Sequence, residues 1–212
     1  WNYNWVILSA YGSNKFLREK YCSVYQHLIK YENELKLRGQ CRYTSSKKIN
    51  KLKEYPGQHH WLELDNNPTL EFLSLFDKPK IAWGNLALNS QFALIKGDLC
   101  INAPAVFIST ENLYLLAILN SKLGEYYIKN LGVSRSGGYF EFKPMFVDKL
   151  PIPQISNAQQ QPYMKLITEI LTLKEKGQDT SDLEEKIDIM VFDLYNISKM
   201  EIQTIYQKLQ KG

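Results

Sequence analysis

The chain has 212 residues, enough for one substantial hydrophobic core or for a compact domain with an appended subdomain. Apolar residues make up 44% and charged residues 23%, close to the averages of soluble globular proteins, which excludes a disordered or low-complexity chain. No apolar run approaches the roughly 20 residues of a membrane-spanning helix, and no signal-peptide pattern begins the sequence, so we expect a cytoplasmic protein with no membrane partner.

The net charge of +4 is distributed unevenly along the chain. Residues 1–150 contain 19 lysines and arginines against 13 aspartates and glutamates, whereas residues 151–212 contain 7 against 9. A basic body with a mildly acidic tail suits a polyanionic partner on one side, although an excess of this size also occurs in proteins that bind no polyanion.

The N-terminal part is expected to be mainly helical. Trp1 already lies in an alternating apolar pattern typical of a strand, so we expect the sequence to be a piece of a longer protein. Residues 13–38 have apolar residues at roughly helical spacing, which predicts one or two helices. Gly39 is expected to end them.

A basic run follows. Between Leu35 and Lys53 there is no acidic residue, and the basic residues are Lys36, Arg38, Arg42, Lys47, Lys48, Lys51 and Lys53. Such a run is either a solvated face or a contact surface for phosphates.

The middle of the chain is expected to form a small sheet. Short apolar runs at residues 61–64, 80–83, 92–95 and 105–108 are separated by prolines and glycines, which is typical of strands. Lys96-Gly97-Asp98 is a plausible reversal between two of them, because glycine tolerates a positive φ.

A strong helix is predicted after this sheet, with Ser109 or Thr110 as its N-cap and a break at residues 132–138. A short strand at residues 139–142 and an extended exit at Leu150-Pro151-Ile152-Pro153 follow. We place a subdomain boundary at this exit.

The last sixty residues are predicted to be helical. Ser181 with Glu184, and Ser198 with Glu201, both fit the capping box that begins a helix. The expected fold is therefore α+β: a small central, mostly antiparallel sheet flanked by helices in a domain at 1–153, and a helical C-terminal subdomain at 154–212 packed on it.

The sequence lacks the motifs of the enzymes that act on DNA. There is no glycine-rich cofactor turn and no Asn/Asp-Pro-Pro-aromatic loop of an amino-methyltransferase; the segment at residues 66–69 is interpreted as a turn. Glu141-Phe142-Lys143 matches half of a metal-dependent nuclease motif, but in an alternating strand Glu141 and Lys143 would share the solvent face.

Other potential metal ligands also lack the spacing of a site. The histidines are expected to be surface or packing residues, and the cysteines reduced thiols; they are His27, His59, His60, Cys22, Cys41 and Cys100. We therefore predict no catalytic residue, no metal site and no cofactor in this chain.

The remaining polar and basic residues suit DNA. Arg42 and Arg135 each carry a planar fork that fits the two major-groove acceptors of guanine, whereas the lysines at 47–53 supply charge to phosphates. In the segment at 134–139 the glycines let the backbone approach a nucleic acid; the alternative is an ordinary glycine-rich connection. The predicted DNA-binding residues are Arg38, Arg42, Tyr43, Lys47, Lys48, Lys51, Lys53, Arg135, Ser136, Gly137, Gly138 and Tyr139.

Several segments together resemble the TaqI-like C-terminal specificity domain of type IIG restriction-modification adenine methyltransferases. They are residues 29–38 (IKYENELKLR), 60–64 (HWLEL), 76–81 (FDKPKI), 115–128 (LLAILNSKLGEYYI), 138–143 (GYFEFK), 150–153 (LPIP) and 182–202 (DLEEKIDIMVFDLYNISKMEI). The resemblance implies a module that reads double-stranded DNA and presents the target adenine to a methyltransferase domain of the same parent chain. S-adenosylmethionine and magnesium are then implied only for parent domains outside this sequence.

The sequence is also compatible with other functions. The LPIP exit followed by helices also resembles the specificity subunits of type I restriction systems. A divalent-metal nuclease using Glu141 and Lys143, and a protein-interaction module using the helices beyond Pro153, are the alternatives from other classes.

Overall fold

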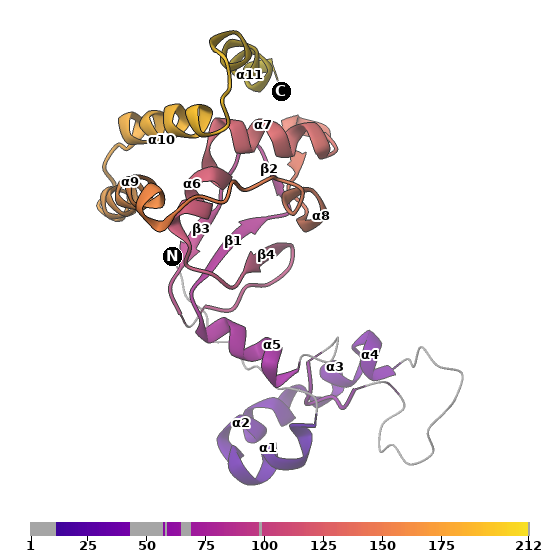
Figure 1. Ribbon diagram of the computed structural model, residues 1–212. Helices are drawn as coiled ribbons and strands as arrows, with labels where there is room; N and C mark the ends of the chain where they lie inside the picture. The colour runs from indigo at the N-terminus through magenta and orange to yellow at the C-terminus, as the bar shows by residue number, and fades with distance from the viewer. Residues whose placement is uncertain (1–11, 43–56, 58, 65–68, 98, 212) are drawn as a thin grey trace. The chain divides into compact units, whose positions relative to one another are not determined.

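The computed structural model describes residues 12–42, 57, 59–64, 69–97 and 99–211. It divides into two compact units, Trp1–Asp77 and Lys78–Gly212, and each is described by itself (Figure 1). The α+β fold with a small antiparallel sheet is confirmed. None of the described helices combines the length and the apolar character needed to cross a membrane.

The first unit consists of short helices around a small core. The helices are α1 (Asn14–Lys20), α2 (Cys22–Leu28), η1 (Ile29–Tyr31), α3 (Glu32–Lys36), α4 (Gly39–Arg42), α5 (Leu70–Ser74) and η2 (Leu75–Asp77). The buried hydrophobic cluster at its centre consists of Leu17, Cys41, Trp61 and Leu62. Residues 13–38 are thus helical in more pieces than predicted, because non-helical backbone at Tyr21, with φ −129° and ψ 55°, separates α1 from α2.

Two predictions for this unit are wrong. Gly39 begins α4 instead of ending a helix. Residues 61–64 form a turn and not a strand, although both Trp61 and Leu62 are buried. Trp61 and Leu62 are apolar because the turn buries them in the core of the unit. A pattern of four residues cannot distinguish such a buried turn from a strand.

The second unit contains the sheet. Its central strand β1 (Lys80–Gly84) pairs antiparallel with β3 (Ala93–Ile95) on one edge and with β4 (Ala105–Ile108) on the other. Ile81 lies opposite both Leu94 and Ile108. These three strands were predicted. Gly97 has the expected positive φ, of 60°, but β3 and β4 are not a hairpin, because β1 lies between them.

A second, two-stranded sheet pairs β2 (Leu86–Ala87) with β5 (Phe140–Glu141). Short helical segments precede and follow β5, namely η3 (Ser136–Gly138) and α8 (Pro144–Val147). The short strand predicted at residues 139–142 is confirmed in its central two residues.

The helix predicted after the sheet is two helices, α6 (Leu113–Asn120) and α7 (Lys122–Leu131). The N-cap of α6 is Asn112, whose side chain accepts from the Leu115 N–H at 3.0 Å, and not Ser109 or Thr110. Ser121 separates the helices and caps α7 by accepting from the Gly124 N–H at 3.1 Å. Helix α6 packs along α9 (Figure 1), and four consecutive residues, 116–119, are at most 2% exposed.

The C-terminal helices are α9 (Asn157–Glu175), α10 (Ser181–Leu194) and α11 (Lys199–Lys211). The capping box at Ser198 is confirmed. The prediction of a capping box at Ser181 is wrong, because Thr180 is the N-cap and its hydroxyl donates to Glu184. A further capping box, at Ser156 with Gln159, was missed.

The exit from the sheet runs extended through Pro151 and Pro153, as predicted, and two tyrosines hold it. The hydroxyl of Tyr114 donates to the carbonyl oxygen of Pro153 at 2.9 Å, and that of Tyr195 donates to Pro151. Side chains of α9, α10 and α11 share one core with those of β1 and α6. The boundary at 153/154 stays a prediction.

Candidate functional site

The segment from Val133 to Glu141 folds back on itself to form a tight surface loop in the second unit. The Arg135 N–H donates to the Tyr139 carbonyl at 2.7 Å, and the Glu141 N–H donates to the Val133 carbonyl at 3.1 Å. Gly137 and Gly138 turn the chain with φ of 79° and 77°. Two successive residues at positive φ require glycine, because a Cβ is strained in this region.

A buried carboxylate lies under this loop. Glu141 is 3% exposed, and its Oε1 accepts from Nε of Arg135 at 2.9 Å and from Nη2 of the same guanidinium. The Nζ of Lys143 lies 3.0 Å from the other carboxylate oxygen. The hydrogen bond from Arg135 and then that from Lys143 hold the pKa of Glu141 below its usual range.

The expectation that Glu141 faces solvent beside Lys143 is therefore wrong. The carboxylate is buried because two cations neutralise it from either side. This also bears on the nuclease alternative, since a carboxylate with both oxygens engaged by cations is a poor ligand for a metal ion. Within the described ranges, no three His, Cys, Asp or Glu side chains come together as a potential metal site.

The outer surface of the loop is polar and aromatic. The Arg135 side chain is 54% exposed although one edge of its guanidinium is bound to Glu141. Ser136 and Gly137 are exposed, Gly138 is half-buried, and Tyr139 is 43% exposed. The structure thus brings all five predicted residues of this segment onto one loop, with a guanidinium edge, a hydroxyl and an aromatic ring available to a ligand.

Arg38 occupies a different environment in the first unit. Its Nη2 donates to the carbonyl oxygens of Trp61 at 2.9 Å and Glu63 at 2.6 Å, and its Nε donates to that of Leu35 at 3.2 Å. The side chain fastens the turn at 61–63 to α3. Arg42 ends α4, and its side chain is outside the description, as are Tyr43, Lys47, Lys48, Lys51 and Lys53.

The neighbouring histidines have packing roles, as predicted. His59 is 1% exposed, and its Nε2 lies 2.5 Å from Oε1 of Gln40. The Nδ1 of His60 accepts from the Leu62 N–H at 3.2 Å. Cys22, Cys41 and Cys100 are free thiols.

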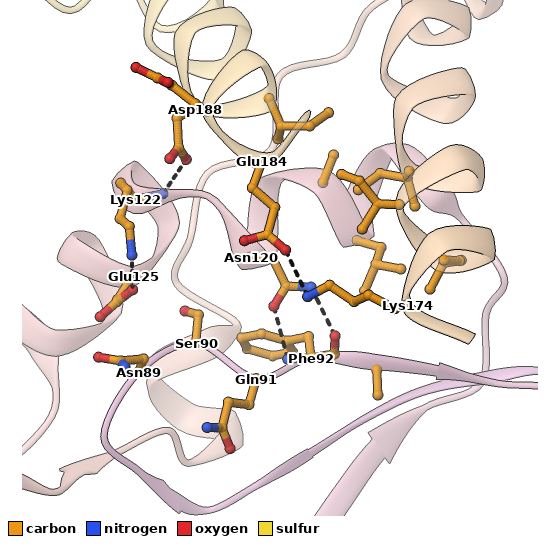
Figure 2. Close-up of a pocket in the computed structure, with 18 of the residues that line it drawn as sticks. Asn89, Ser90, Gln91, Phe92, Asn120, Lys122, Glu125, Lys174, Glu184 and Asp188 are labelled. Atoms are coloured by element: carbon orange, nitrogen blue, oxygen red, sulfur yellow. Dashed lines mark hydrogen bonds and ion pairs between the residues drawn. The ribbon is translucent and has the colours of Figure 1, made fainter. Parts of the chain in front are cut away.

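A pocket in the second unit was not predicted from the sequence. Its volume is about 740 Å³, and it is lined by residues 89–94 and by side chains of α6, α7, α9, α10 and α11 (Figure 2). The lining residues are spread from Asn89 to Tyr206, so no local motif could have revealed them.

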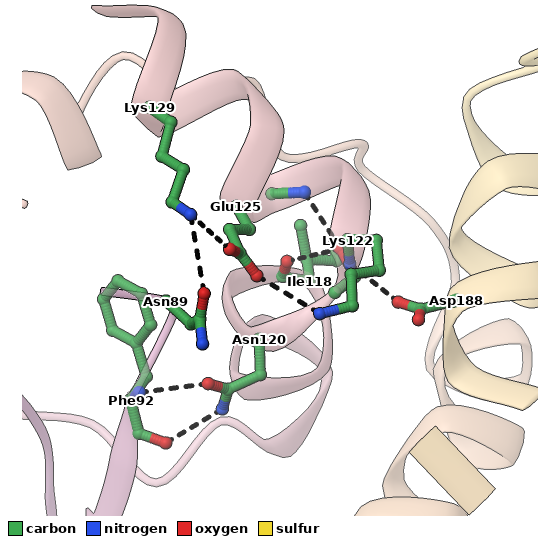
Figure 3. Close-up of polar contacts among 10 residues, drawn as sticks. Asn89, Phe92, Ile118, Asn120, Lys122, Glu125, Lys129 and Asp188 are labelled. Carbon is green, nitrogen blue, oxygen red and sulfur yellow. Dashed lines mark hydrogen bonds and ion pairs between the residues drawn. The ribbon is translucent and has the colours of Figure 1, made fainter. Parts of the chain in front are cut away.

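Polar contacts fix the walls of this pocket (Figure 3). The Asn120 amide accepts from the Phe92 N–H at 3.0 Å and donates to the Phe92 carbonyl at 2.8 Å. Glu125 is 3% exposed and lies between Nζ of Lys129 at 2.8 Å and that of Lys122 at 3.4 Å.

Asp188 joins α10 to the N-terminus of α7. Its Oδ1 accepts from the Lys122 N–H at 2.7 Å. Burial raises the pKa of Asp188 to about 6, and the hydrogen bond from Lys122 opposes that shift. The carboxylate therefore supplements the Ser121 cap from a helix distant in sequence.

One comparison with known proteins covers both units. The family model described as TaqI-like C-terminal specificity domain matches residues 17–152, from α1 to the exit segment.

Proposed function

Because the chain belongs to the TaqI-like C-terminal specificity domain family, we propose that it recognises the target sequence of a type IIG restriction-modification enzyme. It positions duplex DNA for adenine methylation by a methyltransferase domain outside these 212 residues. The chain itself performs no chemistry in this proposal. The end of the family match at residue 152 supports a boundary of the recognition domain near the Leu150–Pro153 exit.

The observation that carries the proposal is the geometry of Arg135. Guanine presents O6 and N7 side by side in the major groove, and a guanidinium binds them best with two parallel N–H groups. Glu141 holds the Nε edge of Arg135, so the side chain is oriented while more than half of it stays exposed. An arginine fixed in this way loses less conformational entropy on binding than a free one.

The neighbouring groups suit the same task. Gly137 and Gly138 carry no side chain that would keep the backbone away from DNA, and Ser136 and Tyr139 of the same loop are exposed. Lys143 binds the second oxygen of Glu141, so the buried charge stays neutralised when Arg135 contacts DNA.

The basic segment of the first unit has a separate role. Lys47, Lys48, Lys51 and Lys53 supply charge to phosphates, which fixes the position of the protein without reading bases. Arg38 anchors the beginning of this segment, since its guanidinium is already used by backbone carbonyls. Arg42 and Tyr43 follow Arg38 by four and five residues and contact DNA in this proposal.

Selection from a random duplex library tests base reading. The wild-type chain should enrich a short sequence at low salt, and Arg135→Ala should lose the preference at one base pair, by about 5- to 150-fold for a single bidentate contact. Arg135→Lys should not restore it, because an ammonium is a point charge without a planar fork. Lys176→Ala removes an exposed cation at the end of α9 and serves as the control.

A lysine variant tests the phosphate contacts. Replacing Lys47, Lys48 and Lys51 by alanine should weaken binding to all duplexes alike and lower the slope of log affinity against log salt by about 3. The enriched sequence should not change. Failure of the wild type to enrich any sequence, or an identical sequence preference in Arg135→Ala, would contradict the proposal.

A further inference from the structure

The pocket of the second unit has the size and walls of a small-molecule site. Its volume of about 740 Å³ lies within the roughly 300 to 1,000 Å³ of typical ligand pockets. Apolar side chains from several segments form much of its lining, among them Phe92 before β3, Ile170 of α9 and Ile187 of α10. All three are buried, between 3% and 6% exposed.

Two polar groups in the lining have unused hydrogen-bonding capacity. Asp188 is 7% exposed, and only its Oδ1 is engaged, by Lys122; among the described residues no hydrogen bond reaches its Oδ2. The Ser90 hydroxyl is buried and has no hydrogen-bond partner in the part of the chain that the structure covers. Figure 2 shows its side chain pointing from the 89–94 segment towards the helices above. A buried polar group without a partner is costly, and a ligand hydroxyl satisfies it once the Ser90 side chain rotates towards the pocket.

The ionised groups around the pocket leave a negative charge unmatched. Its four carboxylates and two ammonium groups are Glu125, Glu184, Glu185, Asp188, Lys122 and Lys174. Lys174 pairs with Glu184 at 2.7 Å. Glu125 lies between Lys122 at 3.4 Å and Lys129, which is outside the lining, at 2.8 Å. Asp188 has no ion pair within the described residues. A cation is therefore the complementary ligand head group.

We propose that this pocket binds a small organic amine with an apolar, hydroxyl-bearing body. Its ammonium group donates to Oδ2 of Asp188, its body packs against Phe92, Ile170 and Ile187, and its hydroxyl pairs with that of Ser90. The inference goes beyond DNA recognition, because the Arg135 loop does not line the pocket. An occupied site would link residues 89–94, which precede and begin β3, to the C-terminal helices.

Three probes of similar size separate charge from shape. Tyramine carries an ammonium group, 4-(2-hydroxyethyl)phenol is its neutral counterpart, and 4-hydroxyphenylacetate is an anion on the same ring. Binding to the full chain is measured by calorimetry and by thermal unfolding at pH 7.5. Tyramine at ten times its Kd should raise the Tm by about 3 to 6 °C for a chain of this size.

Matched variants locate the site. Asp188→Asn keeps an oxygen for the Lys122 N–H but removes the charge, and should weaken tyramine binding on the order of tenfold or more. Ser90→Ala should weaken it by about 2- to 12-fold, the range of one neutral hydrogen bond. Asp182→Asn, at an exposed acid on the same helix and outside the lining, should bind as the wild type does.

The outcomes are distinct. Tyramine binding that Asp188→Asn loses and Asp182→Asn retains supports the proposal. It is overturned if tyramine does not bind, if the neutral or anionic probe binds as tightly, or if both Asp188→Asn and Ser90→Ala bind as the wild type does. Because none of these measurements involves DNA, they stand apart from the outcome of the duplex selection.

Discussion

The guanidinium of Arg38 donates to backbone carbonyls inside the first unit, whereas that of Arg135 is held on one edge by the Glu141 carboxylate. Both arginines stand close to a glycine in the sequence, and both were predicted to contact DNA. Their environments differ. The N–H groups of Arg38 donate to the turn at 61–63, whereas the Arg135 side chain is 54% exposed. The carbonyl groups that Arg38 binds are distant in sequence, and Glu141 lies across a turn from Arg135. Residue type alone therefore could not distinguish the structural role of Arg38 from the exposed position of Arg135.

Arg38 is predicted to stabilise the first unit. Arg38→Ala leaves the carbonyls of Trp61 and Glu63 without their charged donor and should lower the free energy of unfolding of this unit by about 2 to 3 kcal/mol. Arg38→Lys should recover only part of the loss, since one ammonium group replaces the fork. Amide hydrogen exchange in α1–α4 measures the effect, with Lys15→Ala, at an exposed position of α1, as the control. Equal protection in Arg38→Ala and the control would contradict it.

Asp188 is predicted to give the stability a distinctive pH dependence. Its folded pKa of about 6 is above that of an unfolded aspartate, so between these two values the folded protein binds a proton that the unfolded chain does not. Stability from this group therefore rises as the pH falls through 6 and is lost as the pH rises. Asp188→Asn should be more stable than the wild type at pH 7.5, on the order of 2 kcal/mol.

That difference should shrink towards zero as the pH approaches 4, because the wild-type carboxyl group is then neutral as well. Urea unfolding of the two proteins between pH 4 and 7.5 measures it. A gap that stays constant over this range would show that Asp188 does not titrate there.

At the scale of elements, short apolar runs bounded by prolines and glycines predicted β1, β3 and β4, and helical spacing predicted the C-terminal helices. Helical spacing did not predict the break at Ser121. Residues 113–131 continue one apolar pattern, and the chain bends there because Ser121 caps α7 and Asp188 binds the Lys122 N–H from another helix. The second of these contacts is tertiary and leaves no trace in the local sequence.

The bend between α6 and α7 depends on Gly124. A Cβ at this position would lie 2.2 Å from the carbonyl oxygen of Ile118, so the two helices approach too closely for alanine. Gly124→Ala should therefore destabilise the second unit by about 1 to 3 kcal/mol in spite of the higher helix propensity of alanine. Thermal unfolding followed by circular dichroism measures the change.

Gly39→Ala is the matched control, since nothing lies within 4 Å of its Cβ position and Gly39, like Gly124, lies in the first turn of a helix. It should leave the Tm unchanged or raise it slightly. A Gly124→Ala variant that behaves in the same way would mean that the bend adjusts without cost.

At the scale of the whole molecule, the core of the second unit extends across the exit segment. Tyr163, Ile167 and Val191 of the C-terminal helices are buried in the same cluster as Ile81 and Ile118. The sequence indicated that these helices pack on the preceding domain, but it could not show how completely α6 depends on them. The pocket was missed for the same reason, since its lining exists only after six separate segments have packed.

This shared core predicts which fragments fold. Residues 78–212 should fold alone into a monomer with a cooperative thermal transition, because they contain every member of the cluster. Residues 78–153 should aggregate or stay unfolded, since removal of α9 exposes the apolar surface of α6. Size-exclusion chromatography and circular dichroism distinguish the two. A cooperatively folded 78–153 fragment would instead support an independent domain that ends at Pro153.

The paired glycines of the surface loop also indicate how target preference can be altered. Gly137 and Gly138 fix the path of the chain, and most other residues there would refold the loop and move Arg135 away from Glu141. Under the proposed function, a library for retargeting the enzyme should randomise Ser134, Ser136 and Tyr139 and leave the two glycines untouched. New specificities would then arise while the backbone path of the loop and the contact between Arg135 and Glu141 stay unchanged.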